Sequence, residues 1–160
     1  MMTRTRGMLL TVLGLLVGQQ VGAGLLDSAP PTLNGVAAQV IYRMGPVYYH
    51  PGEADTVITC NSFDDVGVSV AIELFDQSDN PVGTLVQAAL AKGGTVTFVT
   101  SADAKRGYWV LVPDLAPLDH GKARVSATTT KLSCAAYHRL RAADGTVQEK
   151  ALELVKKIAR

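Results

Sequence analysis

Residues 66–75 read VGVSVAIELF, and the six residues that follow, 76–81, read DQSDNP. In the first segment every second residue from Val68 to Leu74 is valine, isoleucine or leucine, and this period of two is typical of a β-strand. The second segment is dense in turn-forming residues, which predicts a chain reversal and a partner strand over 82–88. A β-hairpin is therefore the first predicted unit of the fold.

Other β-prone segments flank this hairpin on both sides. They lie at 36–43, 56–60, 95–100, 108–112, 123–129 and 131–140. The segment 45–52 contains two prolines and two glycines, which predicts an edge or an irregular strand. Turn signals recur at a spacing of about 8–12 residues, as in all-β sandwiches and barrels. We expect an all-β, antiparallel sandwich of about seven or eight strands.

The C-terminal segment allows two interpretations. Thr146 and Glu149 form a capping-box pattern that favours a helix. The pair Asp144-Gly145, in contrast, is a strong hairpin turn. We favour a last strand over 151–155, because it would cover the edge left by the segment 131–140.

The N-terminus has the pattern of a secretory signal peptide over residues 1–23. Arg4 and Arg6 precede an apolar run, and small residues up to Ala23 supply a cleavage site. A retained membrane anchor is the alternative, but Gln19 and Gln20 interrupt the run before it reaches the roughly 20 residues of a bilayer span. We expect cleavage, no stable membrane span afterwards, and a periplasmic or extracellular protein. Residues 24–35 then form a flexible lead-in, and residues 36–160 form the sandwich domain.

Length and charge limit the classes of function. A chain of 160 residues is sized for one domain. Its formal net charge is +1, and removal of Arg4 and Arg6 leaves 13 basic against 14 acidic residues. A mature chain with this balance has no general electrostatic attraction to nucleic acid, so we expect no nucleic-acid partner.

The chain has two cysteines, Cys60 and Cys134. An exported protein with an even cysteine count usually pairs them, and two buried free thiols are the alternative. A bridge would close a loop of about 75 residues and contribute roughly 4.5 kcal/mol in the chain-entropy model. Neither cysteine has a second one two residues away, so neither resembles half of a zinc knuckle or of a redox pair.

Two resemblances follow from these cysteines and their surroundings. Two separated strands with central cysteines resemble the immunoglobulin-like sandwich, which implies a bridge between the two sheets. Leu132 stands where the tyrosine corner of that fold needs tyrosine, and no tryptophan follows Cys60 closely. The segments TCNSFDDVGVSVAIELFDQSDNPVG (59–83) and GKARVSATTTKLSCAAYH (121–138) are similar to a loose group of small exported bacterial proteins. That group implies export and fold, and brings no activity to this chain.

Two kinds of reactive site, a copper site and a hydrolytic site, are possible from the residue types present. A copper site could use Cys134 and His138, with His50 and Met44, but four residues of strand span about 13 Å, too far for one metal. Hydrolysis would need a presented nucleophile, and the chain has no G-x-S-x-G turn.

Paired carboxylates occur at Asp64-Asp65 and at Glu73 with Asp76. Such pairs can act as acid and base, but on a strand and its turn they are normally a solvated rim. We expect no catalytic residues, no metal ligands and no cofactor. A small metal-handling (copper) protein or a hydrolase is the alternative.

Two aromatic pairs are candidates for partner contact: Tyr48-Tyr49 and Tyr108-Trp109. Exposed rings could stack on a ligand or anchor a protein. Neighbouring residues of a strand point to opposite faces, so one ring of each pair is expected in the core and the other at the surface. The sequence thus predicts a non-enzymatic binding or structural module whose partner is a protein or an envelope component.

Overall fold

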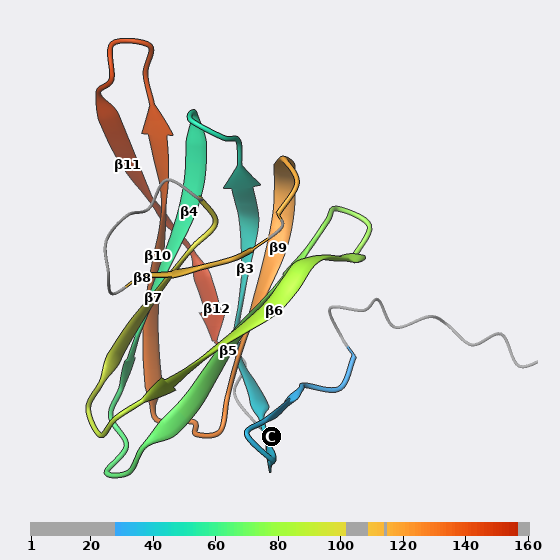
Figure 1. The fold of residues 1–160 in the computed structure, drawn as a ribbon, viewed down its shortest axis with the longest axis vertical. Coiled ribbons are helices and arrows are strands. Elements are labelled where there is room, and N and C mark those ends of the chain that lie inside the picture. The colour runs from blue at the N-terminus through green and yellow to red at the C-terminus, as the bar shows by residue number, and fades with distance from the viewer. Residues whose placement is uncertain (1–27, 102–108, 114, 157–160) are drawn as a thin grey trace, which may run out of the picture.

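A computed structural model describes residues 28–101, 109–113 and 115–156 as two facing β-sheets and a small hairpin (Figure 1). We call the five-stranded sheet of order β11-β10-β4-β7-β8 the disulfide sheet, and the five-stranded sheet of order β12-β3-β9-β5-β6 the opposite sheet. The strand bounds are β1 Thr32–Leu33, β2 Val36–Ala37, β3 Gln39–Tyr49, β4 Ala54–Ser62, β5 Val68–Phe75, β6 Pro81–Leu90, β7 Thr95–Val99, β8 Trp109–Leu111, β9 Leu118–Ala127, β10 Leu132–Arg141, β11 Val147–Leu152 and β12 Leu154–Lys156. The predicted all-β class is confirmed for these residues, none of which is helical.

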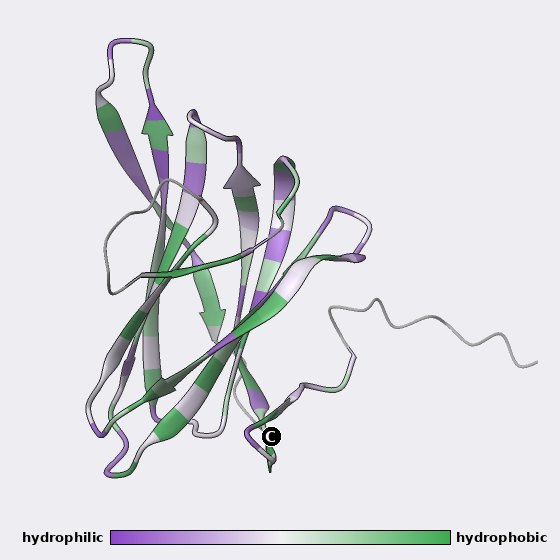
Figure 2. Ribbon diagram, viewed as in Figure 1, coloured by the Kyte–Doolittle hydropathy of each residue, from purple (hydrophilic) through white to green (hydrophobic). Residues whose placement is uncertain are grey.

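One apolar core lies between the two sheets. Ile58 and Phe98 of the disulfide sheet share a buried cluster with Ile72 and Val125 of the opposite sheet. Figure 2 shows the alternation behind this arrangement, with hydrophobic bands repeating along the strands. The molecule is therefore sandwich-like, because both sheets bury one face against the other.

The hairpin predicted from residues 66–81 is confirmed as β5 and β6. β5 is buried along nearly its whole length. A strand with one face in solvent would instead alternate between buried and exposed residues. The reason is that β1 and the residues after β2 cover its outer side, where Leu33 and Ala38 pack on Ala71. Part of the segment expected to be a flexible lead-in is thus packed on the sheet, since Leu33 is fully buried.

The disulfide is present between the two predicted cysteines, but its predicted place between the sheets is wrong. Cys60 on β4 and Cys134 on β10 face each other directly in neighbouring strands of one sheet, with their Cα atoms 4.1 Å apart. That spacing is close to the roughly 4.5 Å of a non-hydrogen-bonded antiparallel pair, which brings side chains together. A cysteine in each of two strands indicates a bridge without saying whether the strands pair side by side or stack.

Three further expectations need correction. The described residues form twelve strands rather than seven or eight, because β1, β2, β8 and β12 have only two or three residues and are too short to give a periodic signal. The disulfide sheet is mixed rather than antiparallel, since β7 and β8 run parallel. The segment 45–52 does not form an edge strand: β3 continues through it to Tyr49 and pairs with β9, with register shifts around Pro46 that do make it irregular.

The C-terminal segment is β-structure, as favoured, but it divides between the sheets. β11 pairs with β10 after a turn at Asp144-Gly145, and β12 then pairs with β3 of the opposite sheet. The predicted strand over 151–155 therefore straddles two strands that meet at Glu153. Within the described ranges, no helix has the length and apolar character needed to cross a membrane.

The disulfide gives a first test of the fold. The double change Cys60→Ala with Cys134→Ala should lower the free energy of unfolding by about 4 kcal/mol, because the bridge closes a long loop in the unfolded chain. Urea denaturation of the oxidised protein and the variant measures the difference. Reduced wild-type protein is the matched control and should lose as much as the variant. A loss below about 1 kcal/mol in both would contradict the chain-entropy explanation.

Candidate functional site

The link between β4 and β5, residues 63–67, exposes two large apolar side chains. We call this link the Phe63 loop; it lies at the lower end of the sandwich in Figure 1. Phe63 is 67% exposed and Val66 is 63% exposed. Single exposed apolar residues are ordinary, but loops at the ends of a sandwich are where such folds place binding residues. The Phe63 loop is therefore the first surface to consider for a partner.

The main chain of the Phe63 loop and of Ser62, the last residue of β4, is tied to both neighbouring turns. The Ser62 N–H donates to the Gly94 carbonyl oxygen at 2.9 Å, in the turn between β6 and β7. The Phe63 N–H donates to the Lys131 carbonyl oxygen, also at 2.9 Å, in the link between β9 and β10. The Asp64 N–H donates to Ser62 Oγ at 3.1 Å. The backbone under Phe63 is thus ordered before any partner binds, which reduces the entropy lost on binding.

The carboxylate of Asp64 also anchors the Phe63 loop, through contacts with the link between β9 and β10. The Thr129 hydroxyl donates to Asp64 Oδ2 at 2.6 Å, and Lys131 Nζ lies 3.7 Å from Oδ1. The Thr129 hydrogen bond, followed by the Asp65 backbone N–H, lowers the pKa of Asp64 below its ordinary value. A general acid needs a raised pKa, so Asp64 suits a structural anion rather than proton transfer.

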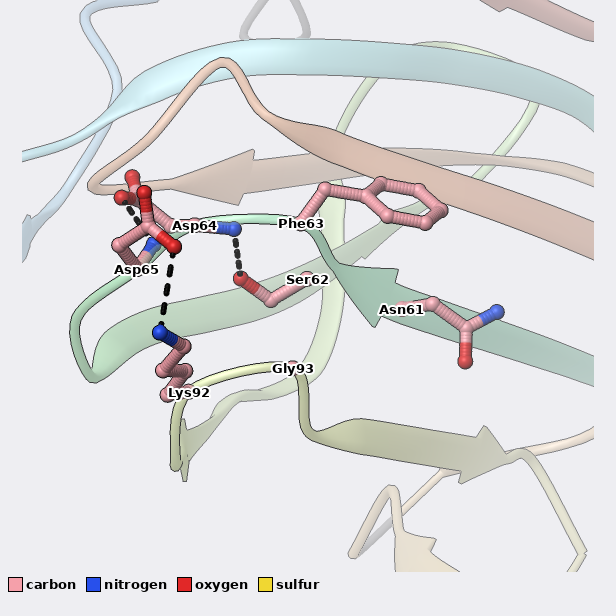
Figure 3. Close-up of a pocket in the computed structure, with 7 residues that line it drawn as sticks. All are labelled: Asn61, Ser62, Phe63, Asp64, Asp65, Lys92 and Gly93. Carbon is pink, nitrogen blue, oxygen red and sulfur yellow. Dashed lines mark hydrogen bonds and ion pairs between the residues drawn. The ribbon is translucent and has the colours of Figure 1, made fainter.

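An open depression with a volume of about 490 Å³ adjoins the Phe63 loop. It is lined by Asn61, Ser62, Phe63, Asp64, Asp65, Lys92 and Gly93. Figure 3 shows the Phe63 ring pointing away from a charged group in which Lys92 Nζ lies 3.3 Å from Asp65 Oδ1. An apolar ring beside a polar rim can bury the ring against a partner while the rim stays hydrated.

The aromatic residues singled out in the sequence lie elsewhere. Tyr49 is buried in the main core, and Tyr48 is half-buried at the opposite end of β4 from the Phe63 loop. Tyr108 lies outside the described residues, and Trp109 contributes its backbone to β8. Neither described tyrosine forms an exposed contact surface of the kind that Phe63 forms.

All three histidines of the chain gather around Tyr48 and its turn, and we call them the histidine cluster. The Tyr48 ring meets the His120 ring edge to face at 5.1 Å between centroids and the His138 ring at 4.8 Å. His50 Nε2 lies 2.7 Å from Asp119 Oδ1. Sequence positions 50, 120 and 138 gave no hint of this proximity, which arises because β3, β9 and β10 bring these residues to one end of the sandwich.

His138 is 5% exposed and lies against the Tyr48 ring and the Thr56 hydroxyl. Its Nδ1 lies 3.2 Å from Thr56 Oγ1, and its Nε2 has no hydrogen-bond partner among the described residues. Burial, with a smaller effect of Lys150, lowers the pKa of His138 below 6.5. A protonated ring would carry a buried N–H without an acceptor, which explains why the neutral form is favoured.

The groups that a copper site or a hydrolytic site would need are engaged in other contacts. The sulfur of Cys134, the thiolate of the copper hypothesis, is bonded to Cys60. Thr56 faces His138 as a nucleophile faces a base, but Thr56 is fully buried, and its hydroxyl also lies 3.0 Å from the Tyr48 carbonyl oxygen. Neither group is presented to a substrate.

The second carboxylate pair, Glu73 with Asp76, is also engaged. Both oxygens of Glu73 accept from the Arg124 guanidinium at 2.8 Å. Asp76 caps its own turn, and hydrogen bonds from Asn80 lower its pKa. These carboxylates organise a strand and a turn.

Sequence reasoning missed Phe63 as a site residue. The signal available was an aromatic residue followed by Asp-Asp-Val-Gly at the end of a β-prone segment, where turn formers stop the strand. Periodicity cannot tell whether the last aromatic residue before a turn is inside or outside, because the strand end is where alternation stops. The depression depends on Lys92 and Gly93, which are distant in sequence and come near only through the β5–β6 hairpin.

The His138 environment predicts how stability changes with pH. The unfolded chain takes up a proton near pH 6.5, whereas folded His138 stays neutral until its lower pKa is reached. The free energy of unfolding should therefore fall as the pH drops below about 6.5, by up to about 1.4 kcal/mol per unit. Urea denaturation between about pH 7.5 and 5.5 measures this slope, and His138→Asn should flatten it.

The matched control for this experiment is His120→Asn. His120 is exposed and has φ 53°, a conformation that asparagine tolerates well. This variant should keep the wild-type slope. An unchanged slope in His138→Asn would contradict the role given to the buried ring.

The geometry thus presents an exposed aromatic loop at one end of β4 and, at the other end, a histidine cluster in which only His138 is buried. Comparison with protein-family models, with curated proteins and with solved structures found no match to this chain.

Proposed function

We propose that this chain is an exported, non-enzymatic binding module of the cell envelope that contacts its partner through the Phe63 loop. The partner is a protein or another envelope component. The scaffold is an immunoglobulin-like β-sandwich that needs no cofactor, and it works in the periplasm or outside the cell. The observation that carries the proposal is the 67% exposure of Phe63, whose own N–H and that of the preceding Ser62 are hydrogen-bonded to the two neighbouring turns.

Export is supported by two independent features. The first 23 residues have the order basic, apolar and small that secretion machinery reads. The bond between Cys60 and Cys134 fits an oxidising compartment, because cytosolic thiols are kept reduced. The immunoglobulin-like assignment is supported by two sheets that share one core and by loops gathered at the two ends.

Binding through the Phe63 loop follows from the energetics of exposed rings. A phenylalanine left in water forgoes roughly 1.5–3 kcal/mol that burial would provide. The same side chain, when it enters a pocket on a partner, acts as an anchor of the kind that dominates interface energies. Because hydrogen bonds to Gly94 and Lys131 already hold the loop, little of that energy is lost in ordering the backbone.

The hydrolytic and metal-handling alternatives receive less support. Their candidate groups are committed to other contacts: Cys134 to Cys60, His50 to Asp119 and Glu73 to Arg124. A catalytic acid or base would be expected to face a cleft with a pKa moved toward neutrality, whereas the pKa of Asp64 moves away from it.

The Phe63 loop can be tested with a photoreactive phenylalanine analogue placed at position 63 in the producing cells. We expect a discrete crosslinked adduct from position 63. The same analogue at position 147 should give none; Val147 is 52% exposed and lies on β11, away from the loop. Phe63→Ala should then weaken binding of the isolated partner by about thirtyfold, as expected for a central anchor worth about 2 kcal/mol.

The same variant should leave the fold intact. Because the Phe63 ring is largely exposed, Phe63→Ala should change the free energy of unfolding by less than about 0.5 kcal/mol. Full retention of partner binding by this stable variant would refute the proposal.

A further inference from the structure

A row of short polar side chains crosses the outer face of the disulfide sheet next to the Phe63 loop. Ser133 on β10, Asn61 on β4 and Thr95 on β7 lie opposite one another in three neighbouring strands, and all three are exposed. We call these residues the polar row. Because neighbouring strands are about 4.8 Å apart, the row is about 10 Å long. Its side chains offer hydroxyl and amide groups and carry no charge.

Phe63 lies on the same face as the polar row. Asn61 is exposed between two buried residues of β4, so its side chain points outward. The hydrogen bond from the Phe63 N–H to the Lys131 carbonyl oxygen extends the β4–β10 ladder by one residue, so Phe63 follows Asn61 on that face, about 7 Å further along the chain. Figure 3 shows the Phe63 ring and the Asn61 side chain on the same side of the Lys92 ion pair. The ring and the polar row therefore form one surface, which includes part of the depression.

The Asn61 amide is oriented by its neighbour on β7. Thr95 Oγ1 donates to Asn61 Oδ1 at 2.5 Å. This bond leaves the N–H groups of Asn61 Nδ2 as donors, and no described residue accepts from them. An oriented amide donor beside hydroxyl groups suits a ligand that is rich in hydroxyl oxygens.

The charges around the depression balance one another. Asp65 is paired with Lys92, and Asp64 is paired with Lys131. Two carboxylates and two ammonium groups leave no net charge beside Phe63, and the polar row adds none. A polyanion or a polycation would gain little attraction here. Charge complementarity therefore favours an uncharged ligand.

We propose that Phe63, the polar row and the depression together bind a neutral, extended oligosaccharide of the cell envelope. This inference rests on the proposed binding role of the Phe63 loop and names the class of its partner. A pyranose ring has an apolar C–H face and hydroxyl groups around its edge. It can stack on the Phe63 ring while its edge exchanges hydrogen bonds with the polar row. The depression, at about 490 Å³, falls within the roughly 300–1,000 Å³ of small-ligand sites.

A protein partner matches this surface less well. The centre of a protein interface is dry and rich in aromatic and arginine side chains. Here a single ring stands at the end of a row of groups that all require hydrogen-bond partners. Sugar hydroxyl groups can replace the water on such groups without leaving them unsatisfied.

Titration calorimetry with cellotetraose and chitotetraose, two neutral β-linked oligosaccharides, tests the proposal. The protein is the chain as processed by the cells that make it, with its disulfide intact, and we expect it to bind at least one of the two. Phe63→Ala should raise the Kd by about thirtyfold, whereas Phe63→Trp should keep binding because a larger ring also stacks. A rise in NaCl from about 0.05 to about 0.5 M should change the Kd by less than about twofold, since no net charge is involved.

Asn61→Asp tests the amide donor. This variant keeps an oxygen that accepts from Thr95 but loses the Nδ2 donor, so it should raise the Kd by about fivefold. Val147→Ala on β11 is the matched control and should bind like the wild type. Urea denaturation should show that all these variants stay folded.

Failure of this proposal can be told apart from failure of the Phe63 loop proposal. A wild-type chain that binds neither oligosaccharide would overturn it, and so would binding that Phe63→Ala leaves intact or that high salt abolishes. A protein adduct from the photoreactive analogue at position 63, without oligosaccharide binding, would keep the loop as a binding site and reject a sugar as its ligand. Absence of both the adduct and oligosaccharide binding would reject both proposals.

Discussion

The pairing of β4 with β10 is the constraint on which both ends of the molecule depend. These strands run antiparallel in continuous register from Ser62 opposite Leu132 to Ala54 opposite Leu140, with the disulfide inside the run. At one end the register sets Phe63 beside Lys131 and so braces the Phe63 loop. At the other end it sets Thr56 opposite His138. A slip of one residue would turn every side chain of one strand to the wrong face.

The outer side of this pair carries an ion pair that reinforces the same register. Arg139 donates from Nε and Nη2 to the two oxygens of Asp55, which is nearly fully buried. Bidentate geometry fixes the relative position of two side chains better than a single contact does. A buried pair of this kind adds little net stability over apolar neighbours, but loss of one partner is costly because the other charge is left buried. The disulfide acts on the unfolded chain, whereas the ion pair penalises misregistered folded states.

Local features were predictable from the sequence, and relations between distant segments were not. The alternation from Val68 to Leu74 and the turn after it specify a hairpin because both signals lie within a few residues. The partner of Cys60 could be named because only one other cysteine exists. The location of the bridge within one sheet could not be predicted, since two strands that pair and two strands that face each other across the core show the same alternation in sequence. The change of sheet at Glu153 was hidden for a different reason, because β12 has only three residues and is too short to show a period.

The candidate site was predictable to a smaller degree than the fold. Tyr48 and Tyr49 were conspicuous as a pair, yet alternation places one in the core and the other against two histidines. Phe63 is a single aromatic residue at a strand end, where burial depends on what lies across the loop. Exposure of one ring is a property of the assembled end of the sandwich, formed by three links that are far apart in the chain.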